Sequence, residues 1–141
     1  MSDKIRHTMK VASFLILIND EKLLMVRRFQ SGWEDGKYTL PSGHIEQGEF
    51  PEDTIIREAK EEVDLNLIKV ELVHVQYQKD RYVDFYFTSD DWSGEAIINA
   101  PDECDDIQWF PIEKSSDIEI PDKIRIAIKS YLAGNSFSVS E

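Results

Sequence analysis

The stretch of this 141-residue chain with the clearest chemical capacity runs from Gly43 to Leu65 and reads GHIEQGEFPEDTIIREAKEEVDL. It starts with a glycine-containing loop and continues through Pro51, a residue suited to the first turn of a helix. At about 100° per residue, three glutamates then fall on one side of that helix. The adjoining side is apolar and predicts docking onto a sheet. The acidic residues are Glu58, Glu61 and Glu62, and the apolar ones Ile55, Ile56, Ala59 and Val63.

Three carboxylates on one helical turn favour a divalent cation. Like charges three or four residues apart cost a helix about 0.2–0.5 kcal/mol per pair, and a bound cation reverses that sign. Hard oxygen donors without histidine or cysteine select Mg²⁺ or Mn²⁺ over Zn²⁺. The expected chemistry is attack of an activated water on phosphorus, with the cation neutralising the pyrophosphate that leaves.

A run such as EAKEE is also common on solvated helix faces. The residues upstream distinguish the two interpretations here. Gly43 is followed after five residues by Glu49, and after seven more by Arg57 and Glu58. Such long, constrained spacing favours a functional site over a merely solvated face.

This spacing resembles the signature box of the Nudix hydrolases. That pattern is Gly, five residues, Glu, seven residues, Arg-Glu, an aliphatic, any residue, Glu-Glu, any residue, Gly, an aliphatic. Ala59 fills the first aliphatic slot, and the other matching positions are Gly43, Glu49, Arg57, Glu58, Glu61, Glu62 and Leu65. The resemblance implies a mixed sheet held between helices, an expectation that extends to most of the chain.

The resemblance also implies roles for individual residues. Glu58, Glu61 and Glu62 would hold the metal, with Glu61 or Glu62 oriented to polarise the attacking water. The backbone carbonyl of Ser42 or Gly43 would be a further ligand.

Arg57 would pair with Glu49 and lock the loop to the helix, a supporting role within the catalytic set. Asp64 stands where the box has its last glycine. Aspartate tolerates a left-handed helix cap at some cost, so we expect a folded but altered turn.

A second departure concerns a further acidic ligand that many family members carry in the loop before the last core strand. Alignment through GEAIINAPDE puts Ala100 at that position. Asp102, Glu103 or no residue takes its place, which leaves the number of metal ions open.

The substrate wall is predicted from four residues. Arg28 ends a predicted strand and resembles a phosphate-contacting position in MutT-like members, although a surface arginine is an equal alternative. Trp33 and Tyr38 could stack on a base or pack in the core. Asp122 resembles a residue with which some members read a base edge, and it also suits a helix start.

Composition bounds the class of protein. The net charge of −12 and pI near 4.6 exclude long nucleic acid as an expected partner, because the surface would repel a polyanion. The single cysteine, Cys104, cannot form an internal disulfide, and it is expected to be a buried structural thiol. We find no cationic leader and no apolar run long enough to span a membrane, so we expect a soluble, cytoplasmic protein.

The order of predicted elements is strands, helix, strands, helix in a single domain spanning residues 1–141. Residues 11–18 (VASFLILI) predict a strand buried on both faces, returning in a hairpin through residues 22–28. Residues 107–110 predict the last strand, and Pro121 the start of a second helix that Gly134 ends. Residues 1–9 and 135–141 are expected to be loose. This predicts an α+β or mixed α/β fold, with a mixed sheet sandwiched between helices.

The leading functional expectation is a MutT-like nucleoside triphosphate pyrophosphohydrolase that needs Mg²⁺ or Mn²⁺, acting on a small nucleotide as a monomer or homodimer. It would release a nucleoside monophosphate and pyrophosphate. The alternatives are an ADP-ribose or nucleotide-sugar pyrophosphatase and a non-catalytic module that senses a nucleotide. Base, sugar and leaving group stay open.

Overall fold

The structure is a computed structural model that describes residues 4–141. In chain order the elements are β1 (Lys10–Leu15), β2 (Ile18–Asn19), β3 (Lys22–Arg28), β4 (Tyr38–Thr39), β5 (Ser42–His44), α1 (Pro51–Val63), β6 (Asn66–Gln78), β7 (Tyr82–Ser93), β8 (Cys104–Pro111), the 3₁₀-helix η1 (Ile112–Asp117), α2 (Asp122–Leu132) and β9 (Phe137–Ser140). The predicted mixed α/β fold is confirmed.

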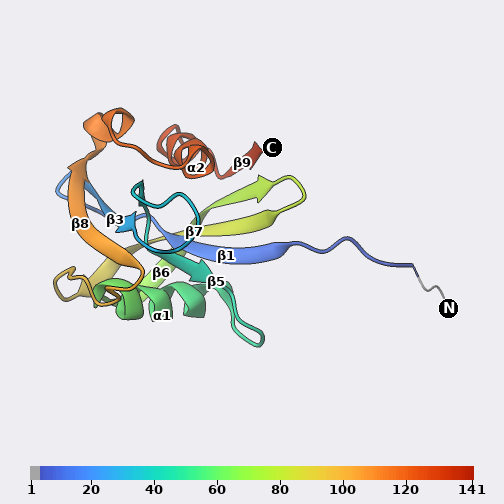
Figure 1. Ribbon diagram of the computed structural model, residues 1–141, viewed down its shortest axis with the longest axis horizontal. Helices are drawn as coiled ribbons and strands as arrows, with labels where there is room; N and C mark the ends of the chain where they lie inside the picture. Colours follow the sequence, from blue (N-terminus) through green and yellow to red (C-terminus); the bar gives the residue numbers. More distant parts are fainter. Residues whose placement is uncertain (1–3) are drawn as a thin grey trace.

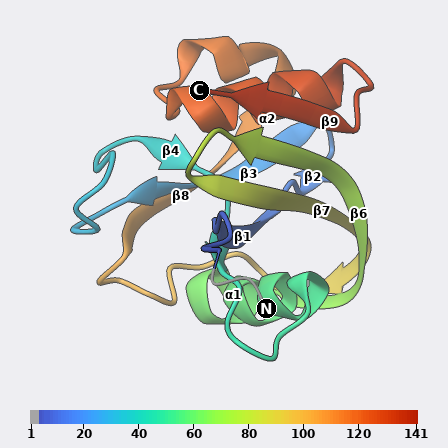
Figure 2. The same ribbon diagram turned by 90° about the vertical axis from the view of Figure 1, so that its right-hand side faces the viewer.

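Two sheets form the centre of the molecule. The larger has the strand order β5-β1-β7-β6-β9, with β1 parallel to β7, β6 parallel to β9, and the other pairs antiparallel. The smaller is built on β3, which pairs with β2, β4 and β8. Helices α1 and α2 lie on opposite sides of the larger sheet (Figures 1 and 2).

Each face of the larger sheet has its own core. Under α1, Ile55, Ala59 and Val63 pack with strand residues such as Leu15 and Phe87. The α2 core is assembled from both sheets and the helix; its members include Ile16, Leu23, Met25, Tyr86, Ile124 and Ile128. Because both faces are covered, strand residues are buried on both sides.

The predicted hairpin of residues 11–18 and 22–28 is wrong in its main pairing. The apolar run divides between two sheets: β1 pairs with β5 and β7, and only Ile18–Asn19 pairs with β3. Between them, Leu15 donates its N–H to the Pro41 carbonyl and Ile16 to the Phe87 carbonyl. Apart from Ser13, the run is apolar because it crosses from one sheet to the other through the interior.

The C-terminal prediction is also corrected. Within residues 135–141, which we expected to be loose, β9 forms the last strand and pairs with β6. The His74 ring anchors it through Nδ1 to the Asn135 carbonyl at 2.9 Å and through Nε2 to Ser138 Oγ at 2.8 Å. Ser138 Oγ also donates to Gln76 Oε1 at 2.7 Å. A buried polar network therefore fixes this end.

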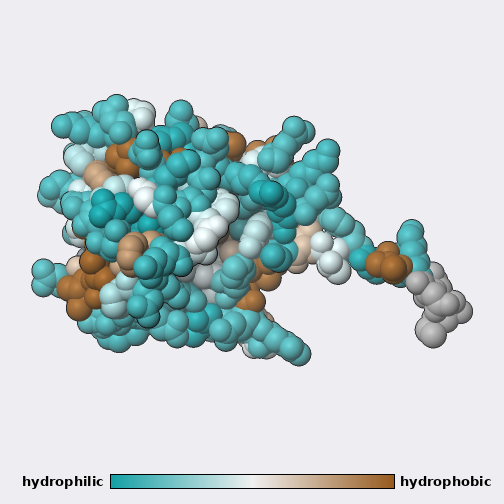
Figure 3. Space-filling model, viewed as in Figure 1, coloured by the Kyte–Doolittle hydropathy of each residue, from teal (hydrophilic) through white to brown (hydrophobic). Residues whose placement is uncertain are grey.

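Residues 4–9 form no helix or strand and extend away from the body (Figure 1), and residues 1–3 of the predicted loose N-terminus lie outside the described residues. The face seen in Figure 3 is predominantly hydrophilic, with small apolar patches. No helix within residues 4–141 is long and apolar enough to cross a membrane.

Candidate active site

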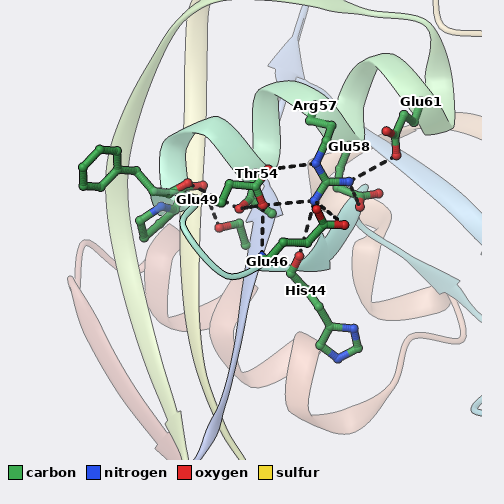
Figure 4. A network of polar contacts seen from close by, with 10 residues as sticks. His44, Glu46, Glu49, Thr54, Arg57, Glu58 and Glu61 are labelled. Carbon is green, nitrogen blue, oxygen red and sulfur yellow. Dashed lines mark hydrogen bonds and ion pairs between the residues drawn. The ribbon is translucent and has the colours of Figure 1, made fainter.

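Arg57 joins the loop after β5 to helix α1 (Figure 4). Its Nε donates to Glu49 Oε2 at 2.8 Å and its Nη2 to Glu49 Oε1 at 3.1 Å, a two-point contact between guanidinium and carboxylate. Thr54 Oγ1 donates to the same Oε1 at 2.6 Å. The geometry is that of the predicted Glu49–Arg57 pair, which ties the loop to the helix.

The charges of this pair are strongly stabilised. Hydrogen bonds from Arg57 and then Thr54 lower the pKa of Glu49 to about 2, and the bond to Glu49 raises the pKa of Arg57 above its usual range. Arg57 Nη1 also donates to Glu58 Oε1 at 2.8 Å and to Glu61 Oε2 at 3.2 Å. One arginine thus orients several carboxylates at once.

Gly43 is required by the close approach of Glu58. A Cβ placed on Gly43 would lie 2.2 Å from Glu58 Cδ, so any side chain there would displace the Glu58 carboxylate. Burial raises the pKa of Glu58, against the lowering effect of Arg57. The glycine of β5 therefore lets the backbone of that strand touch a partly buried carboxylate.

Glu62 carries the most perturbed carboxylate. Its Oε1 is shielded from solvent and has no hydrogen-bond partner. Burial, then the charges of Glu58 and Glu103, raises its pKa to about 8, while Arg28 and a hydrogen bond with the Ser42 backbone act the other way. A buried carboxylate oxygen without a partner is costly, and a cation would supply the missing interaction.

Of the two acids left open as a fourth ligand, Asp102 and Glu103, only Glu103 lies beside the helix glutamates. Glu103 lines the cleft with Glu58 and Glu62, whereas Asp102 does not. Its N–H donates to the Ala100 carbonyl at 2.9 Å in the loop before β8. Glu61 differs from the other two helix glutamates, because its side chain is 59% exposed and outside the cleft lining.

Cys104 follows at the start of β8. Burial, then the charges of Glu62 and Glu103, raises its thiol pKa to about 11. The thiol is buried and protonated at neutral pH, as expected for a structural residue.

Hard oxygen donors dominate this region, which suits Mg²⁺ or Mn²⁺. Within residues 4–141, no three acidic, histidine or cysteine side chains already converge at ligand distance. Arg57 holds Glu58 and Glu61 in its ion pairs. The donor set and the unpartnered Glu62 oxygen nevertheless fit a divalent cation, with rotation of Glu58 away from Arg57.

A cleft of about 1040 Å³ leads away from these carboxylates. Arg28 and Trp33 both line it, with the Arg28 guanidinium 4.8 Å from the Trp33 ring centre and its Nε donating to the Trp33 carbonyl at 2.7 Å. These two residues lie where substrate contact was predicted.

Tyr38 and Asp122 lie outside the lining of the cleft, so the structure does not bring them together with Arg28 and Trp33, and their contact with substrate stays a prediction. The Tyr38 hydroxyl donates to Asp106 and its ring packs edge-on against Phe110. This places it on the other side of the small sheet. Asp122 is exposed in the first turn of α2, and it is the next residue, Lys123, that borders the cleft.

Sequence reasoning missed the far end of the cleft. Asp84, Gln78, Lys123, Tyr82 and His44 line it. The alternation of Asp84 and Tyr86 with Val83, Phe85 and Phe87 in β7 would by itself place the first two residues facing solvent, but both are buried, and Tyr86 packs in the core under α2. The almost wholly apolar residues 11–18 carried the missing signal, since they already indicated a sheet covered on both sides.

This fold and acidic site define a class of protein, and comparison with known proteins identifies it. The NUDIX domain model matches residues 9–130, so the chain belongs to the Nudix family, a family of pyrophosphohydrolases. The MutT NUDIX hydrolase of Burkholderia pseudomallei has a TM-score of 0.75 at 23% identity, covering 86% of this chain and 97% of that one. The MutT protein of Methanosarcina mazei Go1 gives 0.78 at 16%, covering 93% and 98%. These likenesses show the shared fold.

A relative in sequence is the NAD-capped RNA hydrolase NudC of Pseudomonas fluorescens. It is 31% identical over 106 residues, which are 71% of this chain and 36% of that protein. The chain thus spans about a third of the length of the first curated relatives it matches.

Proposed function

We propose that the protein is a Mg²⁺-dependent hydrolase of a nucleoside diphosphate-linked substrate, most specifically a nucleoside triphosphate pyrophosphohydrolase. The observation that carries this proposal is the unpartnered, buried Oε1 of Glu62 at the carboxylate end of the cleft. Glu58 and Glu103 lie near enough to raise its pKa. A cation bound there would neutralise charge on the substrate phosphates and activate the attacking water.

The residues of the chain have distinct tasks in this reaction. Arg28, at the cleft wall, binds a phosphate oxygen. Ionised Glu62 accepts a proton from the water that attacks phosphorus, the anhydride P–O bond breaks, and pyrophosphate leaves. Glu49 and Arg57 hold the helix against the β5 loop, which keeps Glu58 and Glu62 in place.

A second candidate is hydrolysis of a larger diphosphate such as ADP-ribose or a nucleotide sugar. The cleft volume of about 1040 Å³ favours it, since this lies at the upper end of the range for small-molecule pockets. One structural neighbour, at a TM-score of 0.63, is described as an ADP compounds hydrolase.

The test is a substrate panel of nucleoside triphosphates, ADP-ribose and nucleotide sugars, assayed by phosphate release after pyrophosphatase or phosphatase treatment. We expect turnover only with Mg²⁺ or Mn²⁺ and a loss of about 10²-fold or more in Glu62→Gln. Turnover of triphosphates but not of the larger diphosphates supports the first candidate. Binding without turnover of any compound would show a nucleotide-sensing module instead.

A further inference from the structure

The far end of the cleft has a polar wall that the proposed hydrolysis does not use. Asp84 of β7 pairs in register with Ala12 of β1 and Gln76 of β6, so these side chains share the sheet face under α2. Asp84 is only 1% exposed, yet it borders the cleft. A buried carboxylate at the wall of a binding cleft needs a chemical explanation.

One carboxylate oxygen of Asp84 has a hydrogen-bond partner within the protein, and the other has none. Gln78 Nε2 donates to Asp84 Oδ2. Oδ1 is shielded from solvent and has no hydrogen-bond partner. Lys123 borders the same cleft and its charge lowers the pKa of Asp84, but neither a hydrogen bond nor an ion pair joins these two described residues. Oδ1 is therefore a buried acceptor without a donor at the wall of the cleft, which is costly for a charged group.

The walls around this acceptor suit a flat ring. Phe14 borders the cleft and stacks on Tyr86 with ring centres 4.7 Å apart and planes 14° apart. Leu40 and Ile124 supply further apolar lining, and the Glu62 carboxylate belongs to the same cleft. A phosphorylated ligand held at the carboxylate end could thus place an attached heterocycle between apolar walls beside Asp84.

We propose that Asp84 is a specificity-determining residue whose Oδ1 accepts an N–H from the exocyclic amino group of a nucleobase. The inference rests on the proposed function, because the nucleotide enters through the phosphate end of that site. It assigns a substrate class: nucleotides of adenine, cytosine or guanine over those of uracil or hypoxanthine, which lack the amino group.

The selectivity follows from the chemistry of the two groups. Burial raises the pKa of Asp84 to about 6, so at pH 8 the group is ionised and accepts hydrogen bonds only. An amino group pairs with such an oxygen. In UTP compared with CTP, and in ITP compared with ATP, a carbonyl takes the place of the amino group and would face Asp84 acceptor to acceptor; in ITP compared with GTP, a C2–H takes its place and offers no hydrogen bond. A site built to bond a donor rejects the analogue without it, and we expect at least tenfold discrimination. Gln78 acts as a positioning residue by fixing Oδ2.

A structural explanation competes with this one. The Tyr86 hydroxyl, two residues along the same strand, is also buried without a partner. A water bridging it to Asp84 would satisfy both groups without any ligand. In that case Asp84 would stabilise the fold and leave base preference unaffected.

The experiment measures kcat/KM at pH 8 with Mg²⁺ for three pairs of nucleotides. The pairs are CTP and UTP, ATP and ITP, and GTP and ITP. Wild type is expected to favour the amino-bearing member of each pair. In Asp84→Asn the amide oxygen can accept from Gln78, which leaves the NH₂ group at the open position as a donor. The preference should then fall at least tenfold or invert. Asp90→Asn, the same change at an exposed position of β7, should keep the wild-type preference.

A binding measurement separates the two proposals. Calorimetric titration of wild type and Asp84→Asn with CMP and UMP reports base selection without turnover. Hydrolysis with equal rates within each pair, or with a preference unchanged in Asp84→Asn, overturns the inference and leaves the proposed function standing. Selective CMP binding that depends on Asp84, without hydrolysis of any triphosphate, would overturn the proposed function and leave the inference about Asp84 standing. Neither binding nor hydrolysis would overturn both. Gln78→Met, which removes the orienting donor, should weaken the discrimination and serves if Asp84→Asn does not fold.

Discussion

The ionisation of Glu62 should make the metal-free protein less stable as pH rises. Burial raises the pKa of this carboxyl from the 4.5 of a free glutamate to about 8. The folded state therefore binds a proton that the unfolded state has already released, and stability is lost between pH 4.5 and about 8. Below pH 4.5 both states are protonated, and above pH 8 both are ionised, so the effect is confined to that window.

The size of the effect follows from the shift. A shift of this size corresponds to at most roughly 5 kcal/mol, at about 1.4 kcal/mol per pKa unit. Relaxation and entry of water reduce such penalties, so we expect a loss of at least about 2 kcal/mol. Asp84 acts in the same direction but only up to its own pKa of about 6. Glu49, with its pKa near 2, has the opposite sign and matters only in acid.

The assay is urea denaturation in EDTA at pH 6, 7, 8 and 9. The free energy of unfolding of wild type should fall with pH relative to that of Glu62→Gln, which cannot ionise. Glu52→Gln, an exposed change on the same helix, should follow wild type. Added Mg²⁺ should restore stability at pH 8 by binding only the folded, ionised site. Parallel pH profiles for wild type and Glu62→Gln would refute the assignment of the buried charge.

Three further changes test the supporting structure. Gly43→Ala should displace Glu58, because the new Cβ would lie 2.2 Å from its Cδ. We expect a roughly 10²-fold lower kcat, with a circular dichroism spectrum that shows a folded protein. An unchanged kcat would show that this contact is dispensable. Asp64→Gly should raise the free energy of unfolding by about 0.5 kcal/mol, because the residue has a φ of 59° at the end of α1 and glycine adopts that conformation more easily. Loss of the 2.6 Å Lys60–Asp64 ion pair offsets part of this gain. A lower free energy of unfolding would mean that the ion pair outweighs the backbone strain. Deleting residues 136–141 should lower the Tm by several degrees by removing β9 from the edge of β6, and an unchanged Tm would show that the pairing contributes nothing.

The parts of the site that sequence predicted are those encoded locally. Glu49 and Arg57 are eight residues apart, and helix geometry together with one loop suffices to bring them together. Glu58 and Glu62 follow from the same helix. The left-handed cap at Asp64 was expected from the resemblance to the Nudix box, which has a glycine at that position.

What sequence missed depends on pairings between distant strands. Residues 11–18 resemble one strand because the run is buried in both of the sheets to which it contributes. Only the pairing of β1 with β7 and of β2 with β3 shows that the run is divided into two strands. Asp84 looked solvent-facing because alternation does not report that α2 covers that face. The surroundings of Tyr38 also depend on distant pairing, since its ring packs against Phe110 of β8.

We propose that Glu58 and Glu62, with Glu103 beside them, hold a divalent cation at the end of the cleft. Titration with Mn²⁺ monitored by electron paramagnetic resonance counts bound ions directly, and excess Mg²⁺ should displace them. We predict at least one site in wild type at pH 8, weakened tenfold or more in Glu58→Gln and in Glu62→Gln and retained in Glu52→Gln. Equal Mn²⁺ binding by all four proteins would contradict this assignment of the site.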